Sequence, residues 1–245
     1  MVTSVARRRR TLSRERVLAA AVELADGQGL EAVTMRQVAS GLGVEAMSLY
    51  HHLPGKEGLL DGLVDSVMAE VDTAMADLEP AEDWRQTVRQ RCLAARAVML
   101  VHPWAPVLIS SRTSIPPAVY DHFETLVRVM IDAGFSYRLA HRALHSLGSM
   151  VLGFVQELFR PEGVADDESP QDSAEAFAQL AETLLHIAAM VTTEVHDNDG
   201  DMLGWCDSRA EFEFTLDLLL DGYEAQRAVL GRPGEPGRPT SVGPQ

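Results

Sequence analysis

Apolar residues recur with a helical period of about 3.6 residues along most of this chain. Few segments alternate between apolar and polar positions with period 2, so the sequence predicts an all-α protein. Residues 14–28 carry an apolar stripe that ends at Gly29, a residue type that commonly terminates helices. Further helices are predicted from about Lys56 to Asp77, Asp83 to Val101, Pro116 to Gly134, Ser136 to Phe159, Ala174 to Val195 and Ser208 to Val229.

The segment from Thr34 to Lys56 has a different pattern, because two short helical stretches flank a glycine turn. Thr34 and Gln37 form a capping-box sequence that starts the first helix. Gly41 and Gly43 let the backbone turn, and the second helix is predicted to start near Val44. This is the plan of a helix-turn-helix, which places its second helix in the major groove of DNA.

The outer face of this segment supplies our candidate DNA-binding residues. An ordinary helical hairpin with the same core is the alternative reading, because simple helix-turn-helix patterns give false positives. The residues that can share a core are Val38, Leu42, Val44, Leu49 and Leu53. The DNA-binding candidates are Thr34, Met35, Arg36, Glu45, Ala46, Met47, Ser48, Tyr50, His51, His52 and Lys56.

The run from Arg14 to Leu63 resembles the DNA-binding head of the tetracycline-repressor (TetR) family. The resemblance rests on RERVLAAAVELADGQG, GLEAVTMRQVASGLGV and SLYHHLPGKEGLLDGL, which includes the family's recognition-helix signature. A weaker resemblance continues from Trp84 to about Glu157, where SSR, VYDHFETLVRVM, AGFS and LGFVQE follow in the family's order. It implies a homodimeric, ligand-responsive transcription regulator, most often a repressor, that binds a pseudo-palindromic operator in double-stranded DNA.

The resemblance also implies roles for single residues of the second helix. Ser48, Tyr50, His52 and Lys56 match positions that contact phosphates or bases in the family. Ala46 stands where the tetracycline repressors carry a base-reading glutamine. We therefore expect base recognition here to use apolar contact with thymine methyl groups and Glu45 as an acceptor for a cytosine amino group.

Charge and composition divide the chain into a head, a body and two terminal segments. Residues 1–60 carry a net charge of +2 and residues 61–245 carry −17, so the head is the end suited to DNA. The sequence predicts a disordered basic arm (1–12), a DNA-binding domain (13–62), a ligand-binding and dimerisation domain (63–230) and a disordered Pro/Gly-rich tail (231–245). Arg7 to Arg10 fit either a phosphate or minor-groove contact or a solvated tail.

The body is predicted to dimerise and to bind a small molecule. Residues 136–159 and 208–229 are apolar on more than one stripe, which favours a partner, and the matching helices form the dimer interface in the resembled family. Leu108 stands where that family holds a magnesium-tetracycline complex with a histidine, so we expect a more apolar or aromatic effector. Our pocket candidates, which fit an ordinary core equally well, are Met99, His102, Trp104, Leu108, Phe123, Met150, Phe154 and Glu157.

No metal or other cofactor is expected. His141 and His145 have the i, i+4 spacing of a shared metal site, but no third ligand is evident. Asp197 to Asp201 lack the further ligands of a calcium loop.

The sequence also lacks the marks of an enzyme. It has no Gly-rich phosphate loop after a strand and no nucleophile elbow. A small-molecule carrier or enzyme on a helical fold, without operator binding, is the competing hypothesis. Two cysteines, no signal peptide and no run of about 18 apolar residues indicate a cytoplasmic protein without membrane insertion.

Overall fold

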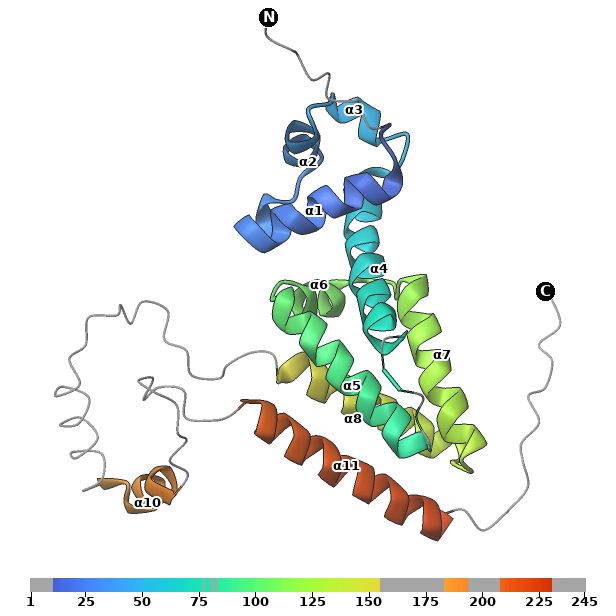
Figure 1. Cartoon of the computed structure of the whole chain (residues 1–245), viewed down its shortest axis with the longest axis vertical. Helices are drawn as coiled ribbons and strands as arrows, with labels where there is room; N and C mark the ends of the chain where they lie inside the picture. Colours follow the sequence, from blue (N-terminus) through green and yellow to red (C-terminus); the bar gives the residue numbers. More distant parts are fainter. Residues whose placement is uncertain are drawn as a thin grey trace, which may run out of the picture. The chain divides into compact units, whose positions relative to one another are not determined.

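The computed structural model describes residues 11–154, apart from 77, 80 and 82, together with 183–193 and 208–230. Every regular element within these ranges is helical, which confirms the predicted all-α class (Figure 1). The basic arm up to residue 10, the outer parts of the predicted helices 136–159 and 174–195, and the tail from residue 231 lie outside the described residues.

The described residues belong to two compact units. The first contains residues 11–154 and 220–230, and the second contains residues 183–193 and 208–219. The second unit therefore holds α10 (Leu185–Thr193) and the first half of α11 (Ser208–Leu230). The polar network and the ion pairs of His102, Arg112 and Arg91 described below lie within the first unit.

The head folds from local signals that the sequence carries. It consists of α1 (Arg14–Gln28), the 3₁₀ turn η1 (Leu30–Ala32), α2 (Met35–Leu42) and α3 (Ala46–Leu49). Ser13 caps α1, since its Oγ accepts the backbone N–H of Arg16 at 3.3 Å. Gly29 ends the helix with a φ of 81°, as its position predicted. α1 packs on both α2 and α4 through a face that includes the buried Val17 and Ala21.

A long helix leaves the head and enters the body. The elements that follow the head are α4 (Gly55–Ala76), α5 (Trp84–Val101) and α6 (Ala105–Ser111). The predicted break after Val101 is real, because α5 and α6 are bent by 106°. The residues between this break and Pro116 include α6, a helix that the sequence analysis did not predict. Pro106 is compatible with this helix because it lies in the first turn, where its missing N–H donor is not needed.

Two further helices complete the packing around α4 and α5. These are α7 (Pro117–Asp132) and α8 (Tyr137–Gly153), which pack on each other and on α5, while α4 also contacts α7. The last part of α11 joins this unit through Arg227, whose guanidinium donates to the Ala133 carbonyl and lies over the Trp84 and Phe135 rings. Within the described residues no single helix is long and apolar enough to cross a membrane, although the bent pair α5 and α6 together meets the length and composition criteria.

Candidate nucleic-acid interface

The start of α2 has the N-cap hydrogen bond of the predicted capping box. Thr34 is the N-cap residue, and its Oγ1 accepts the backbone N–H of Gln37 at 3.2 Å. Val33 and Val38, the flanking apolar pair, are both buried. Gly43 makes the turn alone, with a φ of 67° in the left-handed region, whereas Gly41 lies inside the helix. The turn therefore depends on one glycine rather than two.

The second helix of the motif is short and is anchored by buried leucines. α3 spans only four residues and continues into a turn that ends near Leu53. Leu49 and Leu53 are buried, as predicted, while Leu42 and Val44 are half-buried at the edge of the core. The buried Leu49 and Leu53 thus fix the direction in which the other side chains of α3 point.

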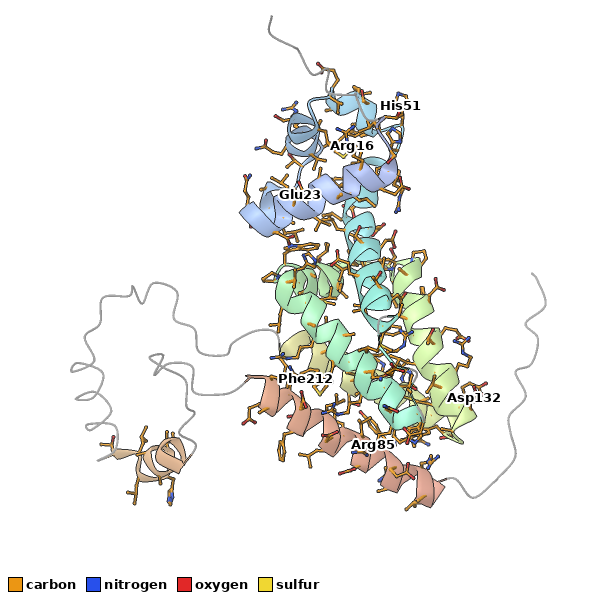
Figure 2. All side chains as sticks on the ribbon, in the orientation of Figure 1. Arg16, Glu23, His51, Arg85, Asp132 and Phe212 are labelled. Carbon is orange, nitrogen blue, oxygen red and sulfur yellow. The ribbon has the colours of Figure 1, made fainter. Side chains whose placement is uncertain are left out.

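The opposite face of α3 is open and combines apolar, aromatic and polar groups. Met47 is 71% exposed and Tyr50 is 50% exposed, which is unusual for side chains of this size. Figure 2 labels His51, which lies in the turn that follows α3. We call this surface the reading face; its exposed residues are Glu45, Met47, Tyr50, His51 and Lys56, and its half-buried residues are Ala46, Ser48 and His52.

The candidates on α2 differ from one another. Arg36 is exposed and Thr34 is half-buried, so both keep surface that DNA can reach. Met35 is buried with 8% of its surface exposed, so its side chain belongs to the core of the head. Any contact of Met35 with DNA would have to use its backbone.

A polar network that the sequence analysis did not anticipate joins the head to the body. His102, which caps the end of α5, is buried and faces two carboxylates. Its Nδ1 lies 2.7 Å from Asp26 Oδ1 on α1, and its Nε2 lies 2.9 Å from Glu70 Oε2 on α4. Trp104 Nε1, at the start of α6, donates to the same Asp26 oxygen at 2.6 Å. Three helices of the first unit therefore meet at one imidazole.

The other end of α6 is tied to α4. Arg112 follows the last residue of α6, and its side chain is only 9% exposed. Its Nη2 lies 2.8 Å from Glu57 Oε2 and 2.7 Å from Asp61 Oδ1, both in the first two turns of α4. Glu57 follows Lys56 of the reading face directly, so α6 is fixed by ion pairs at the end of α4 that adjoins the reading face.

The body contains a second histidine, half-buried on α7, with the opposite protonation preference. Burial of His122 on α7, together with the nearby Arg91 charge, lowers its pKa to about 4. Its Nδ1 lies 3.3 Å from Arg91 Nη1, so the neutral ring accepts a hydrogen bond from the guanidinium. Burial of His102 would also lower its pKa, but its hydrogen bonds to Asp26 and Glu70 outweigh that effect and raise it.

Comparison with known proteins identifies the family of this helical architecture. Residues 77–227 match the family described as tetracyclin repressor-like, C-terminal domain, and residues 17–63 match the bacterial regulatory proteins of the tetR family. The chain belongs to the TetR family. It is therefore a ligand-responsive regulator with a helix-turn-helix DNA-binding domain and a C-terminal ligand-binding domain.

Individual TetR proteins resemble the chain over most of its length. It is 29% identical to the tetracycline repressor protein class E of Escherichia coli over 88% of this chain and 92% of that protein. It is 30% identical to the HTH-type transcriptional repressor DrrR1 of Streptomyces coeruleorubidus, over 92% of this chain and 81% of that protein.

Solved TetR structures agree with the fold. A possible TetR family regulator from Streptomyces coelicolor A3(2) has a TM-score of 0.67 and 29% identity, over 87% of this chain and 100% of that one. A TetR variant from Acinetobacter baumannii AYE in complex with minocycline has a TM-score of 0.59 and 25% identity, over 89% of this chain and 99% of that one.

The pocket candidates of this TetR chain are distributed over four helices and their ends. Met99, Leu108 and Met150 are buried, while Phe123 and Phe154 are half-buried. His102 and Trp104 are buried too, but their polar atoms are used by the network around Asp26. Glu157 lies outside the described residues. That these side chains line an effector pocket stays a prediction.

His141 and His145 lie side by side on α8, with ring centroids 4.6 Å apart. Within the described parts of the chain, no group of three or more His, Cys, Asp or Glu residues is arranged to hold a metal ion. Asp197 to Asp201, the acidic segment weighed as a calcium loop, lie outside the described residues.

The sequence analysis missed Asp26, Glu70 and Arg112. On a linear sequence the two acidic residues look like solvated positions on helix surfaces, which is the usual place for carboxylates. The only local signal was the position of His102 and Trp104 directly after a predicted helix end. Their acidic partners lie 76 and 32 residues from His102, a separation that no helical periodicity covers.

Proposed function

We propose that this protein is a transcriptional repressor that binds a pseudo-palindromic operator as a homodimer and leaves it when a small molecule binds the body. The observation that carries this proposal is the reading face, where Met47 and Tyr50 are exposed on a helix anchored by the buried Leu49 and Leu53. Large side chains that stay exposed on a helix anchored in this way are typical of a binding surface. Its small size favours two copies on one operator, because specific DNA interfaces bury far more surface than one short helix offers.

The chemistry of the reading face suggests how it recognises DNA. Met47 offers an apolar contact for thymine methyl groups, and Glu45 can accept a hydrogen bond from a cytosine amino group. Ser48, Tyr50 and Lys56 can donate to phosphate oxygens, and Lys56 adds a full positive charge. Bases would then be read mainly by residues 45–47, while the flanking donors fix the position of the helix on the backbone.

The exposed side of α11 supports the dimer. Phe214 is 63% exposed and Leu218 is 56% exposed, and their i, i+4 spacing places them on one face of the helix. Two such side chains in a row favour burial against a partner. On α8, Gly148 and Gly153 have open space where a side chain would stand, so another backbone can approach closely there. A second copy of the chain is the partner we propose, as in the resembled family.

An apolar or aromatic effector is supported by the candidate residues of the body. Met99, Leu108, Met150 and the half-buried Phe123 and Phe154 are large and adaptable, and none carries a charge. A similar TetR structure holds minocycline, a polycyclic molecule. An effector lowers operator affinity only if it binds the conformation that has left the operator more tightly than the conformation that holds it. The difference between these two affinities sets the size of the effect.

Selection of bound fragments from a genomic library tests this function directly. We expect recovery of a two-fold symmetric site whose affinity falls steeply with salt. A carrier or enzyme without operator binding should enrich no symmetric site above non-specific background at moderate salt. Titration of the selected operator complex with candidate polycyclic compounds then tests release. A compound that binds the body but leaves the operator affinity unchanged would contradict the proposed switch.

A further inference from the structure

The strongest unexplained feature of the structure is the environment of His102. The side chain is 5% exposed, and both ring nitrogens face carboxylate oxygens, Asp26 Oδ1 at 2.7 Å and Glu70 Oε2 at 2.9 Å. A neutral imidazole carries one N–H, so it can donate to only one of these carboxylates. The other nitrogen would then present its lone pair to a negatively charged oxygen. Only the imidazolium form donates to both.

The hydrogen bonds of His102 and Trp104 depend on each other because they share an acceptor. Asp26 Oδ1 accepts from both His102 and Trp104, so the same carboxylate holds the end of α5 and the start of α6. Glu70 provides the second acceptor from α4. Charge-assisted hydrogen bonds of this kind are stronger than neutral ones and fix the direction of both groups. Loss of the positive charge would therefore loosen α1, α4 and α6 together.

We propose that the His102 imidazolium is a positioning residue for the DNA-binding head, joining α1, α4 and the start of α6, and that operator binding is linked to its proton. This inference rests on the proposed operator binding. Joined in this way, the reading face keeps a fixed orientation on the body, which two heads need in order to meet both half-sites of one operator. Without the imidazolium, α1 is held by its apolar packing on α2 and α4 but loses this polar attachment, and the head loses part of its preorganisation.

The direction of the pH dependence follows from the groups that face the ring. These are Asp26 from α1 and Glu70 from α4, while α6 contributes the uncharged Trp104. Burial opposes the charge on His102, but the two acidic partners outweigh it and raise its pKa above the ordinary value of 6.5. The contribution of the network is therefore complete below pH 6.5 and is lost as the pH rises through the raised pKa.

The test measures operator affinity of the full chain between pH 6 and 9 at constant salt, using the operator fragment selected from the genome. We expect wild-type affinity to fall as the pH rises, by up to about tenfold per pH unit for each linked proton, one from each copy of His102 in the dimer. His102→Gln should bind about tenfold more weakly at pH 6 and should lose most of this pH dependence. His51 and His52 on the reading face are present in both proteins, so the difference between the two profiles isolates His102.

Three further variants separate positioning from simple destabilisation. His102→Arg keeps a permanent positive charge and should restore affinity at pH 6 without restoring the wild-type pH profile. Asp26→Asn removes one acceptor charge and should mimic His102→Gln, with little further loss in the double variant. His122→Gln is the matched control, because its ring is already neutral throughout this range. Parallel profiles for wild type and His102→Gln would overturn the inference.

Amide hydrogen exchange of α1 provides a second readout that needs no DNA. Wild-type protection of Arg14–Gln28 should decrease as the pH rises, after correction for the intrinsic exchange rate, whereas His102→Gln should show low protection throughout. Equal protection in the two proteins would contradict the positioning role even if operator binding proves real. If no symmetric operator exists, the proposed function fails, and with it the link to DNA. Hydrogen exchange then still decides whether His102 holds α1.

Discussion

The Arg112 guanidinium lies 2.8 Å from the Glu57 carboxylate, although 55 residues separate them in the sequence. This ion pair fixes the end of α6 to the first turn of α4, directly after Lys56 of the reading face. His102 and Trp104 fix the other end of α6 to α1 and α4. A ligand-induced shift of α6 would therefore act on the head at two points, and the two attachments can be tested separately.

Replacement of Arg112 by glutamine should lower the free energy of unfolding by about 1–2 kcal/mol, since it removes a hydrogen bond to Glu57 and an ion pair with Asp61 from a side chain that is only 9% exposed. Urea denaturation of the full chain measures this change. Arg209→Gln on α11 is the control, because Arg209 is 75% exposed and its ion pair with Glu213 lies on the surface. Equal losses in both variants would show that the Arg112 contacts add no more than a surface pair.

Lys56→Ala should weaken operator binding and reduce the slope of log affinity against log salt by about one, because it removes one phosphate contact. Tyr50→Ala should weaken binding with less effect on the slope, since it removes no charge. Fluorescence anisotropy at several salt concentrations distinguishes the two. Arg128→Ala on α7 removes an exposed charge away from the reading face and should leave the slope unchanged. An unchanged slope in Lys56→Ala would exclude the phosphate contact.

Leu218→Arg or Phe214→Arg should convert the proposed dimer into a monomer, because either places a charge on the exposed apolar face of α11. Sedimentation velocity gives the mass of each variant. Gln226→Arg adds the same charge to the same helix at an exposed position about 80° around the axis from Leu218, and should weaken the dimer less. Leu216 is unsuitable for this test because it is buried, and an arginine there would disturb folding itself. A monomeric wild-type protein would disprove the dimer.

His122 should make the protein less stable in acid. Its pKa is about 4 in the folded protein and 6.5 for a free side chain, so below pH 6.5 the unfolded chain binds a proton that the folded chain does not. Between pH 7 and pH 5 this removes about 2 kcal/mol of unfolding free energy. His122→Gln should show correspondingly less acid sensitivity in urea titrations at the two pH values. Equal sensitivity would mean that His122 takes up its proton without loss of structure.

Gly62 should not tolerate even a methyl group. A Cβ there would lie 2.4 Å from Leu18 Cδ2, where α4 packs against α1, so Gly62→Ala must displace a buried side chain. Alanine normally stabilises a helix over glycine by up to about 1 kcal/mol. Gly41→Ala in α2 has open space and should show that gain, whereas Gly62→Ala should lower the melting temperature. Thermal unfolding followed by circular dichroism compares the two, and a similar rise in both would show that Leu18 can move aside.

Local signals in the sequence were sufficient for the head and for most helix boundaries. The capping box of Thr34 and Gln37, the terminator Gly29 and the buried Leu49 and Leu53 all lie where the sequence predicted them. Caps, glycine turns and apolar stripes act over a few residues, so their information is contained in a short window of sequence.

Other features depended on the packing of distant segments. The residues that flank α6, His102 and Arg112, find their partners on α1 and α4, far away in the sequence. On α11, some apolar residues are buried, whereas Phe214 and Leu218 stay exposed. The apolar pattern of the sequence does not distinguish the two groups. The sequence alone determined the all-α class, the helix-turn-helix and the family. The network around His102 was decided by tertiary structure, because the charge of one buried imidazole depends on carboxylates that only folding brings to it.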